Sequence, residues 1–431
     1  MTCDRTDILV AGGGPAGCVA AIALARAGFE VGLVTAPRRP AVSEGLSARV
    51  VRFLEQPDYQ RTRAALGPCV RREASWNGRT TGANLEWVVE RAAFDRTLLE
   101  DVAAAGVRVA IEPLHGLRCI DGEWHAQAGG QVWRAGFLVE ARGRRAPGRR
   151  RHGPAAIALA QTWSGLAPRA CTAIAPFEGG FAWFATGGHG RGSLQLVVAP
   201  PGRAERQTLL GSVMSAVPAR AWLEGGRPCS AVSVRHAGTS RADAPLEPAR
   251  IRIGDAALAL DPLSGHGVFE ALASATAAAP VVTTLLRRPG DAALAEAFYE
   301  ERVEQAFLRF ARTARDFYRL EERWQAAPFW QARRGWPDDL PAHPSPSAAA
   351  PQIQTKPVIE GGFVVAREVI VTADQPRGVF MVDGVPLVPL LRAVQTDEVA
   401  SIEAAARRFD RAPGEVETAL AWLRYRGLLP S

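Results

Sequence analysis

Three glycines near the amino terminus have the spacing of a turn that binds phosphate. They are Gly12, Gly14 and Gly17, and they directly follow the apolar run Ile8 to Val10. The first glycine permits a tight turn, the second lets the backbone approach a pyrophosphate, and the third lets a helix pack closely on the preceding strand. The positive end of that helix then faces the phosphates. We therefore predict a dinucleotide site that is made by Gly12, Gly14, Pro15, Ala16 and Gly17.

The end of the second apolar segment departs from the usual pattern of dinucleotide sites. After a break at Gly28, the residues Val31 to Val34 complete a strand, turn, helix and strand. An acidic residue at the next position usually bonds a ribose hydroxyl, but this chain has Thr35. A hydroxyl can accept the same bond, although charge-assisted hydrogen bonds are about twice as strong as neutral ones. We expect Thr35 to contact the dinucleotide and to hold it less tightly than a carboxylate would.

Three further side chains have types that could act on a bound cofactor or substrate. Arg91 and Asp95 share one face of a predicted helix, where Arg91 either contacts the cofactor or forms a surface ion pair. Asp255 follows a short apolar strand and one glycine, and it either bonds cofactor hydroxyls or caps a turn. His266 lies in a loop between glycines. It is either a general base that deprotonates a product or a loop histidine with satisfied hydrogen bonds. His266 is the one candidate catalytic residue.

Composition narrows the class of protein. The chain has 431 residues, 47% of them hydrophobic and 22% charged, which is typical of a globular protein of two or three domains. Its six cysteines have no paired spacing, so we expect neither a disulfide framework nor a metal site. The net charge of +7 is carried by arginine, because Lys356 is the only lysine. We expect a cytoplasmic protein with no signal peptide and no membrane segment, since Glu270 and Pro280 interrupt the one long apolar stretch.

The elements that must position these residues follow from apolar periodicity and turn signals. The sequence predicts, in order, a loop at 43–46 that runs into a helix over 50–54, a hairpin over 70–88, a helix over 88–106, several short strands over 107–139, a β-rich region over 157–236, a strand at 251–253 and long helices from 292 to about 323. A segment over 337–357 is rich in proline, alanine and serine and predicts a linker. Three short strands (364–365, 369–371 and 379–382) and three helices (387–394, 401–409 and 413–426) follow it.

Four separated motifs together resemble one known superfamily. They are Gly12 to Gly17, Arg91-x-x-Phe-Asp-x-x-Leu, the turn Ala141 to Arg144, and Gly254-Asp255-Ala256-Ala257 followed by Asp261-Pro262-Leu263-Ser264-Gly265-His266-Gly267. In this order they resemble the FAD-dependent aromatic hydroxylases of the p-hydroxybenzoate hydroxylase superfamily, which also contains the flavin-dependent halogenases. The resemblance covers residues 1 to about 335. It implies FAD as the cofactor, with contacts from Ser43, Glu44, Arg91, Asp255, Pro262, Gly265, His266 and Gly267 as well as from the first glycine turn and Thr35.

Two further segments resemble one subgroup of this superfamily. The segment from Phe317 to Trp330 and the sequence Asp261 to Gly265 resemble the flavoprotein monooxygenases of tryptophylquinone cofactor biogenesis, which act in the maturation of quinohemoprotein amine dehydrogenase. The resemblance implies that O2 and reduced FAD form a C4a-hydroperoxide, which hydroxylates a tryptophan of a partner polypeptide, the small subunit of an amine dehydrogenase. No second glycine fingerprint is present, so either NAD(P)H visits the flavin directly or a separate flavin reductase supplies the electrons.

Other functions remain open at this point. A flavin-dependent halogenase would need a catalytic lysine and a Trp-x-Trp-x-Ile-Pro signature, but Lys356 lies in the predicted linker and the nearest segment is Phe181-Ala182-Trp183-Phe184. We therefore favour hydroxylation, with halogenation and small-molecule aromatic hydroxylation as alternatives. An alternative of a different class is a redox sensor that binds FAD without catalysis and whose last domain binds DNA.

The resemblance implies an α/β fold (α+β overall) with a Rossmann-type FAD-binding domain and an inserted β-rich substrate domain. We place the FAD-binding domain at 1–70, 89–155 and 246–336, the substrate domain at 71–88 and 156–245, the linker at 337–357, and a small winged-helix-like domain at 358–431. This last domain resembles peptide-recognition domains, which favours docking of a peptide. A purely structural cap and a DNA-binding domain are the alternatives. Glu415 and Glu417 open its third helix and would repel phosphates, so nucleic acid is disfavoured as a partner. The arginine run 142–151 is either a solvated loop or a docking patch for an acidic partner.

Overall fold

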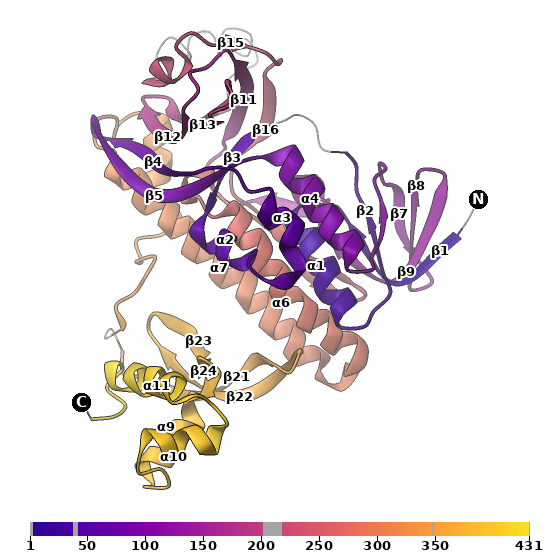
Figure 1. Ribbon diagram of the computed structural model, residues 1–431, viewed down its shortest axis with the longest axis vertical. Coiled ribbons are helices and arrows are strands. Elements are labelled where there is room, and N and C mark those ends of the chain that lie inside the picture. The colour runs from indigo at the N-terminus through magenta and orange to yellow at the C-terminus, as the bar shows by residue number, and fades with distance from the viewer. Residues whose placement is uncertain (1–2, 38–41, 201–217, 347–348, 431) are drawn as a thin grey trace. The chain divides into compact units, whose positions relative to one another are not determined.

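The computed structural model describes residues 3–37, 42–200, 218–346 and 349–430 (Figure 1). The chain forms two compact units. The first unit comprises Met1–Val282 and Tyr299–Asp339, and the second comprises Thr283–Phe298 and Leu340–Ser431. The mixture of parallel and antiparallel sheets confirms the predicted α/β fold class. The finer division of the first unit into an FAD-binding and a substrate domain stays a prediction.

The first unit contains a parallel sheet that follows the predicted strand, turn, helix and strand. β1 (Cys3–Ala11) pairs in parallel with β2 (Val31–Val34) on one side and with β9 (Gln131–Glu140) on the other. β6 (Arg108–Ala110) continues the parallel order beyond β2, and β19 (Arg250–Arg252) continues it beyond β9. Antiparallel strands are added around them: β7 (His115–Ile120), β8 (Glu123–Ala128) and β18 (Leu246–Glu247). The carboxyl ends of the five parallel strands share one edge, where ligands of such sheets bind.

Burial explains why these segments form the centre of the sheet. Ile8, Leu9 and Val10 are fully buried, and all of Val31–Val34 is buried, as expected of strands that are covered on both faces. α1 (Pro15–Arg26) and α4 (Arg91–Ala104) lie side by side (Figure 1). α1 is rich in alanine, and its small side chains allow close approach to the neighbouring strands and to α4.

A second, nine-stranded sheet in the same unit contains the predicted hairpin and the β-rich region. Its strands are β3 (Ser43–Ser47), β4 (Cys69–Trp76), β5 (Arg79–Glu90), β11 (Ile157–Ser164), β12 (Ala170–Phe177), β13 (Gly180–Gly187), β14 (Arg191–Val198), β15 (Arg227–Pro228) and β16 (Ser233–His236). Asn77 and Gly78 turn the hairpin β4–β5 with φ values of 50° and 74°. Two successive positive φ angles are what a tight two-residue hairpin requires, and an Asn-Gly pair supplies them.

Two sequence predictions in this region are wrong. The predicted loop at 43–46 is strand β3, which pairs antiparallel with β5 from Ser43 opposite Glu90 to Ser47 opposite Glu86. Only Leu46 of β3 is buried, so the segment lacks the alternation that would have revealed a strand. The helix predicted to begin at Val88 begins at Arg91, because Val88 and Val89 belong to β5 and pair with β3.

Short elements and long helices complete the unit. The short elements are α2 (Ala48–Phe53), η1 (Pro57–Tyr59), α3 (Gln60–Ala64), η2 (Gly143–Arg145), β10 (Arg149–Arg151), η3 (Pro218–Leu223), β17 (Ser240–Ala242), η4 (Gly254–Ala256), β20 (Leu258–Ala259) and η5 (Pro262–Ser264). They are followed by the two long helices α6 (Gly267–Arg287) and α7 (Ala292–Leu320) and by α8 (Pro328–Arg334). The end of α6, η6 (Pro289–Asp291) and the start of α7 belong to the second unit. Among the described residues, α6 alone has the length and apolarity of a membrane-crossing helix, and 61% of its most apolar window is buried within the protein. Its Glu270 forms a buried ion pair with Arg302 of α7 at 2.8 Å, as in a core helix.

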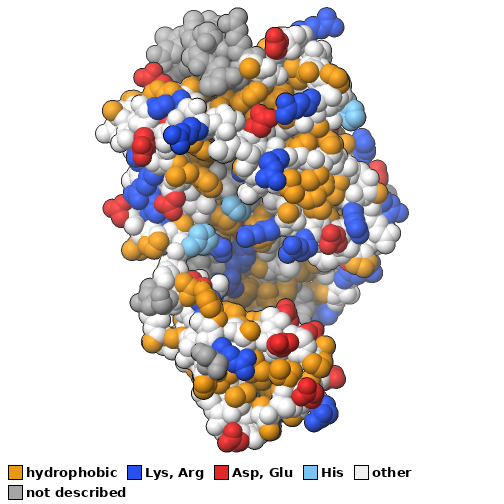
Figure 2. All heavy atoms as spheres, turned by 60° about the vertical axis from the view of Figure 1, so that its left-hand side comes forward, with side chains coloured by type: hydrophobic (Ala, Val, Ile, Leu, Met, Phe, Trp, Pro, Cys, Tyr) orange, Lys and Arg blue, Asp and Glu red, His pale blue; other side chains and the backbone are white. Residues whose placement is uncertain are grey.

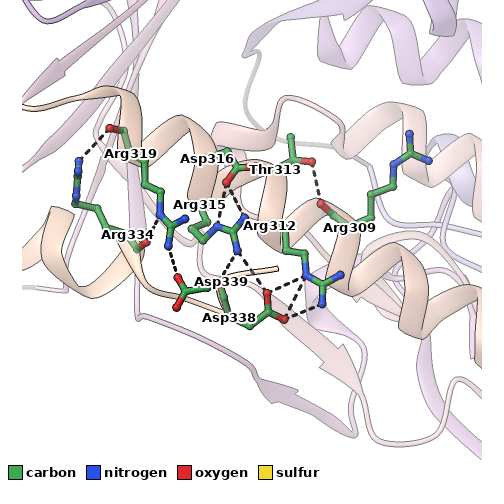
Figure 3. A network of polar contacts seen from close by, with 9 residues as sticks. All are labelled: Arg309, Arg312, Thr313, Arg315, Asp316, Arg319, Arg334, Asp338 and Asp339. Atoms are coloured by element: carbon green, nitrogen blue, oxygen red, sulfur yellow. Dashed lines mark hydrogen bonds and ion pairs between the residues drawn. The ribbon is translucent and has the colours of Figure 1, made fainter. Parts of the chain in front are cut away.

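A network of arginines along one face of α7 binds the residues that follow α8 (Figure 3). Arg312 makes a two-pronged contact with Asp338 at 2.9 and 2.8 Å, and Arg315 also bonds Asp338. Arg319 bonds Asp339 at 2.6 Å. The spacing of three and four residues places these arginines on one side of the helix. The beginning of the predicted linker is therefore bound to α7.

The second unit has a three-stranded antiparallel sheet followed by three helices. Its elements are β21 (Gln352–Glu360), β22 (Phe363–Thr372), β23 (Gln375–Val379), β24 (Met381–Val382), β25 (Val385–Pro386), α9 (Leu387–Gln395), α10 (Ile402–Phe409) and α11 (Pro413–Tyr425). Its core includes the fully buried Val385, Leu387 and Val416. The three helices match their predicted ranges, with small shifts at the ends.

The sequence misplaced some boundaries of this unit. β21 begins at Gln352, inside the segment predicted as linker, and the two strands predicted at 364–365 and 369–371 are one strand, β22. The amide of Val364 donates to the hydroxyl of Thr284 in α6 at 2.8 Å. The end of α6 and the start of α7 thus group with the second unit, whereas the sequence had placed both helices in the FAD-binding domain.

Candidate FAD site

The glycine turn between β1 and α1 has the geometry that its spacing predicts. Gly12 has a φ of +115°, and a side chain there would lie 2.4 Å from the carbonyl oxygen of Ala141. A Cβ at Gly17 would lie only 1.8 Å from the carbonyl oxygen of Gly12. A Cβ at Gly14 would meet nothing within 4 Å. Two glycines are therefore needed for packing, and the middle one borders open space.

The start of α1 is suited to an anion. Gly14 is its N-cap, no side chain caps its amides, and Pro15 occupies the first turn. The first amides of a helix have no partner within the helix, and they carry the positive end of its dipole. The backbone of Ala16 and Gly17 therefore presents donors beside the open space at Gly14. This is a cradle for phosphate groups.

Motifs that are far apart in the sequence meet at this cradle. Ala141, at the end of β9, packs against both Gly12 and Gly17. Gly254 lies so close to α1 that a Cβ on it would be 2.7 Å from the Cβ of Ala16. Asp255 next to it accepts a hydrogen bond from Arg144 Nε at 3.2 Å. The structure thus brings the first, third and fourth motifs to one edge of the parallel sheet.

Thr35 also lies beside the turn. Its Cγ2 methyl is 2.8 Å from the position that a Cβ on Gly13 would take. Its hydroxyl donates to the carbonyl of Ala36 at 3.3 Å, a long bond to its own chain. The residue is at the end of β2, where the ribose contact is expected, and its role toward the cofactor stays a prediction.

Arg91 is the centre of a buried ion triad. Its Nε donates to Asp95 at 2.8 Å, and its Nη1 donates to Glu44 of β3 at 2.8 Å. Burial works against the charge of the guanidinium, but the carboxylates of Glu44 and Asp95 raise the pKa of Arg91 above its ordinary value. The surface ion pair considered from the sequence is therefore wrong. The triad lies near α1, which packs against α4. Burial and then the charge of Asp95 raise the pKa of the Cys18 thiol in α1. Ser43 lies beside Glu44, and its amide donates to Ser193 Oγ at 2.8 Å.

The loop from Pro262 to Gly267 is held from within the protein and open at its tip. Asp261 accepts from the amide of Leu263 at 2.9 Å and from the hydroxyl of Tyr318 at 3.1 Å. Pro262, Gly265 and Gly267 are exposed. Gly265 has a φ of +67°, which favours glycine at this turn. The loop therefore presents its backbone to a ligand while one carboxylate fixes its base.

His266 has a lowered pKa, and one hydrogen bond selects its neutral tautomer. Burial, opposed by its bond to Ser264 and assisted by the charges of Arg49, Arg309 and Arg72, lowers its pKa. Its Nδ1 contacts the carbonyl oxygen of Ser264, and a carbonyl only accepts, so Nδ1 carries the proton. Nε2 is then a proton acceptor.

Comparisons with known proteins decide the family. The model of an FAD binding domain matches residues 7–61. A solved structure of peptidyl tryptophan dihydroxylase QhpG, described as essential for tryptophylquinone cofactor biogenesis, is 36% identical to this chain with a TM-score of 0.82. The match covers 99% of this chain and 100% of that one. The chain belongs to the FAD-dependent hydroxylase and halogenase family that includes QhpG.

Halogenases of this family are also similar to the chain. A curated tryptophan 2-halogenase from Chondromyces crocatus is 26% identical over 395 residues, which are 77% of this chain and 71% of that protein. The structure of the flavin-dependent halogenase CmlS covers 98% of this chain with a TM-score of 0.74 and 17% identity, which shows a shared fold. As a member of this family, the chain is an FAD-dependent oxidoreductase.

The residues at the sheet edge fit FAD. The uncapped amides of α1 and the open space at Gly14 suit its pyrophosphate, and Asp255 offers a carboxylate for hydroxyl groups. When bound, FAD supplies two-electron redox chemistry. No group of three or more histidine, cysteine, aspartate or glutamate side chains that could hold a metal occurs in the described ranges.

The arginine run 142–151 has a role that the sequence did not reveal. Arg142 bonds the buried Glu140, and Arg144 bonds Asp255 and the carbonyls of Gly238 and Leu260. Arg149 donates to Ser240 Oγ at 2.8 Å. Arg149 also donates to the carbonyl of Asp255 at 3.3 Å, so two of the six arginines, Arg144 and Arg149, brace the Asp255 turn. Arg145, Arg150 and Arg151 are exposed. The run is therefore neither a wholly solvated loop nor a wholly exposed docking patch. The sequence did offer one signal for this role, because Arg144 belongs to the third motif, the turn Ala141 to Arg144.

Proposed function

We propose that this protein hydroxylates a tryptophan side chain of a partner polypeptide during the biogenesis of a tryptophylquinone cofactor. The observation that carries the proposal is the 36% identity to a peptidyl tryptophan dihydroxylase over the full length of both chains. The partner is the small subunit of an amine dehydrogenase, and two hydroxyl groups are added, as the name of that relative suggests. O2 supplies the oxygen, and NAD(P)H, directly or through a separate reductase, supplies the electrons.

Halogenation is the second candidate, because halogenases share the fold. The resemblance to halogenases implies that a halogenase needs a catalytic lysine. The only lysine of the chain, Lys356, is in β21 of the second unit and not on an element of the FAD site. Hydroxylation is therefore favoured.

The residues of the site take the following roles in the proposal. The backbone of Gly14, Ala16 and Gly17 binds the pyrophosphate, and Asp255 and Thr35 bond hydroxyl groups. The loop from Pro262 to Gly267 faces the flavin. His266 Nε2 accepts the proton that a hydroxylated ring carbon must lose to restore aromaticity. A neutral imidazole with a lowered pKa is ready for this task at physiological pH.

The second unit serves polypeptide docking in this proposal. Residues 358–431 contain eight arginines against ten carboxylates, a formal net charge of −2. Several of these arginines are paired, including Arg392 with Glu368 and Arg426 with Asp374. On the face displayed in Figure 2, this unit, in the lower part of the picture, carries acidic side chains among the basic ones. These charges support a polypeptide partner over DNA, which needs a basic surface.

Mass spectrometry of the partner tests the proposal. Candidate amine dehydrogenase small subunits are co-expressed with this protein, and peptides are searched for a tryptophan that has gained the mass of one or two oxygen atoms. The matched control is the Gly14→Ala variant, which we expect to keep the fold and to weaken FAD binding. Free tryptophan and halide are added in parallel reactions with the purified protein. Efficient hydroxylation of free tryptophan, or a halogenated indole, would contradict the proposal.

A further inference from the structure

An ion pair on the nine-stranded sheet has no role in the site described so far. Arg72 of β4 donates from Nη1 to Oε1 of Glu86 of β5 at 3.1 Å. Glu86 is 8% exposed, and the Arg72 side chain is 20% exposed. Placing two charges in the interior costs free energy unless hydrogen bonds satisfy both groups.

Both partners carry buried atoms without a hydrogen-bond partner in the described structure. These atoms are Nε of Arg72 and Oε2 of Glu86. The Oε2 atom lies against β3, where a Cβ on Gly45 would be 2.5 Å away. Gly45 follows Glu44, whose carboxylate binds Arg91. The pair therefore lies beside the strand that joins the ion triad.

The guanidinium of Arg72 points toward the cofactor loop. Its Nη1 is 3.8 Å from the position that a Cβ on Gly265 would take. It is also one of the three cations whose charge lowers the pKa of His266. The other two, Arg49 and Arg309, are exposed, whereas Glu86 fixes Arg72. The register of β4 and β5 shifts between Arg71 and Glu73, and such bulges redirect side chains next to active sites.

We propose that Arg72 is a catalytic residue that stabilises negative charge at the flavin during oxygen transfer, and that Glu86 is the residue that positions it. The inference rests on the proposed function and adds a residue to it. A ring C–H, O2, two electrons and two protons give a ring hydroxyl and water. One oxygen atom forms a bond to the ring carbon. As the O–O bond breaks, its electron pair stays on the other oxygen atom, which takes up protons and leaves as water.

A guanidinium is suited to this charge. It keeps its proton throughout, so it acts as a fixed hydrogen-bond donor while protons come from solvent and the ring proton goes to His266 Nε2. A preorganised donor in a partly buried site needs no reorganisation as charge develops, and removing one such donor lowers rates about 10²- to 10³-fold. The electrons come from FAD that NAD(P)H or a reductase has reduced.

The experiment compares Arg72→Met with Arg71→Met in the full-length protein with FAD bound. Arg71 is the neighbouring arginine on the same strand, and it is exposed. Its side chain lies over Gly82 of β5, where a Cβ would be 2.5 Å from its Cδ. The first readout needs no polypeptide: sulfite affinity and the reduction potential of the bound flavin report positive charge beside it. The second is the ratio of hydroxylated partner to hydrogen peroxide per flavin oxidised. Thermal melting and FAD titration check that each variant folds and binds the cofactor.

We expect Arg72→Met to weaken sulfite binding at least tenfold, lower the flavin potential, and cut oxygen transfer about 10²-fold in favour of hydrogen peroxide. Arg71→Met should match the wild type in all of these. Arg72→Lys keeps the charge and should recover part of the sulfite affinity. This variant tests the inference if the methionine variant does not fold. Glu86→Gln should give an intermediate loss. A wild-type sulfite affinity in folded Arg72→Met would overturn the inference. If Arg72→Met alters the flavin properties but the wild type yields no hydroxylated peptide, only the proposed function is contradicted.

Discussion

Two glycines of the same turn should respond in opposite ways to alanine. Gly14 has a φ of −80° and a ψ of 179°, an extended conformation that alanine adopts without strain, and a Cβ there meets nothing within 4 Å. Gly14→Ala should therefore fold. Its cost in the absence of FAD is that of a poorer N-cap, up to about 1 kcal/mol. That cost lowers the melting temperature by about 1–2 °C in a unit of this size, because the unfolding entropy is about 2 cal/mol/K per residue.

The same methyl group should weaken FAD binding. It occupies the space that a phosphate needs in order to reach the amides of Ala16 and Gly17. Losing one hydrogen bond to a charged group costs about 1.5–3 kcal/mol. Since 1.4 kcal/mol is a factor of ten, we expect the Kd for FAD to rise about 10- to 150-fold.

Gly17→Ala should instead damage the fold. Alanine in a helix gains about 1 kcal/mol over glycine, but this Cβ would lie 1.8 Å from the backbone oxygen of Gly12. A backbone atom cannot turn aside as a side chain does, so α1 must move, and overpacking costs about 1–3 kcal/mol or more. Melting of the apoprotein and FAD titration by flavin fluorescence separate the two effects. An unchanged FAD affinity in Gly14→Ala, or an unchanged melting temperature in Gly17→Ala, would refute this account of the turn.

Four other outcomes are expected. Arg91→Met removes the shared partner of Glu44 and Asp95, so unfolding free energy should drop by about 3–5 kcal/mol in denaturant titrations, and a loss below 1 kcal/mol would show that the triad is unimportant. Burial lowers the pKa of His266 from 6.5, so the folded state binds fewer protons than the unfolded state. Stability that is present above pH 6.5 should therefore be lost as pH falls. Melting curves toward about pH 5 should show this loss in the wild type and less of it in His266→Asn. Thr35→Ala should release FAD faster on dialysis, and tight retention would show that Thr35 makes no ribose contact. Reactions with chloride or bromide should yield no halogenated indole, as judged by mass spectrometry, because the one lysine is on β21.

The parts of the fold that were predictable are those that local chemistry determines. Gly12, Gly14 and Gly17 each have a conformational or steric requirement that is visible in the sequence, and the structure places all three as expected. The hairpin at Asn77 and Gly78 was predictable because few residue pairs adopt two positive φ angles. The buried strands of the parallel sheet appear as continuous apolar runs.

The parts that were missed depend on partners distant in the sequence. β3 is a strand because β5 pairs with it, and only Leu46 among its residues is buried. Arg72 and Glu86 lie on paired strands whose register shifts at a bulge, so their separation in the sequence does not predict their contact. Arg144 belongs to a basic run in the sequence, and only tertiary structure shows that it bonds Asp255.

Asp261 accepts hydrogen bonds from two elements at once, so the rate at which the cofactor loop opens can be measured. Its carboxylate holds the amide of Leu263 at the base of the loop and the hydroxyl of Tyr318 on α7. That amide can exchange its hydrogen with deuterated solvent only when the bond to Asp261 opens. The exchange rate of one amide, at Leu263, therefore counts the openings of the loop. A ligand that settles on the loop should slow that exchange in proportion to its occupancy, before any reaction takes place.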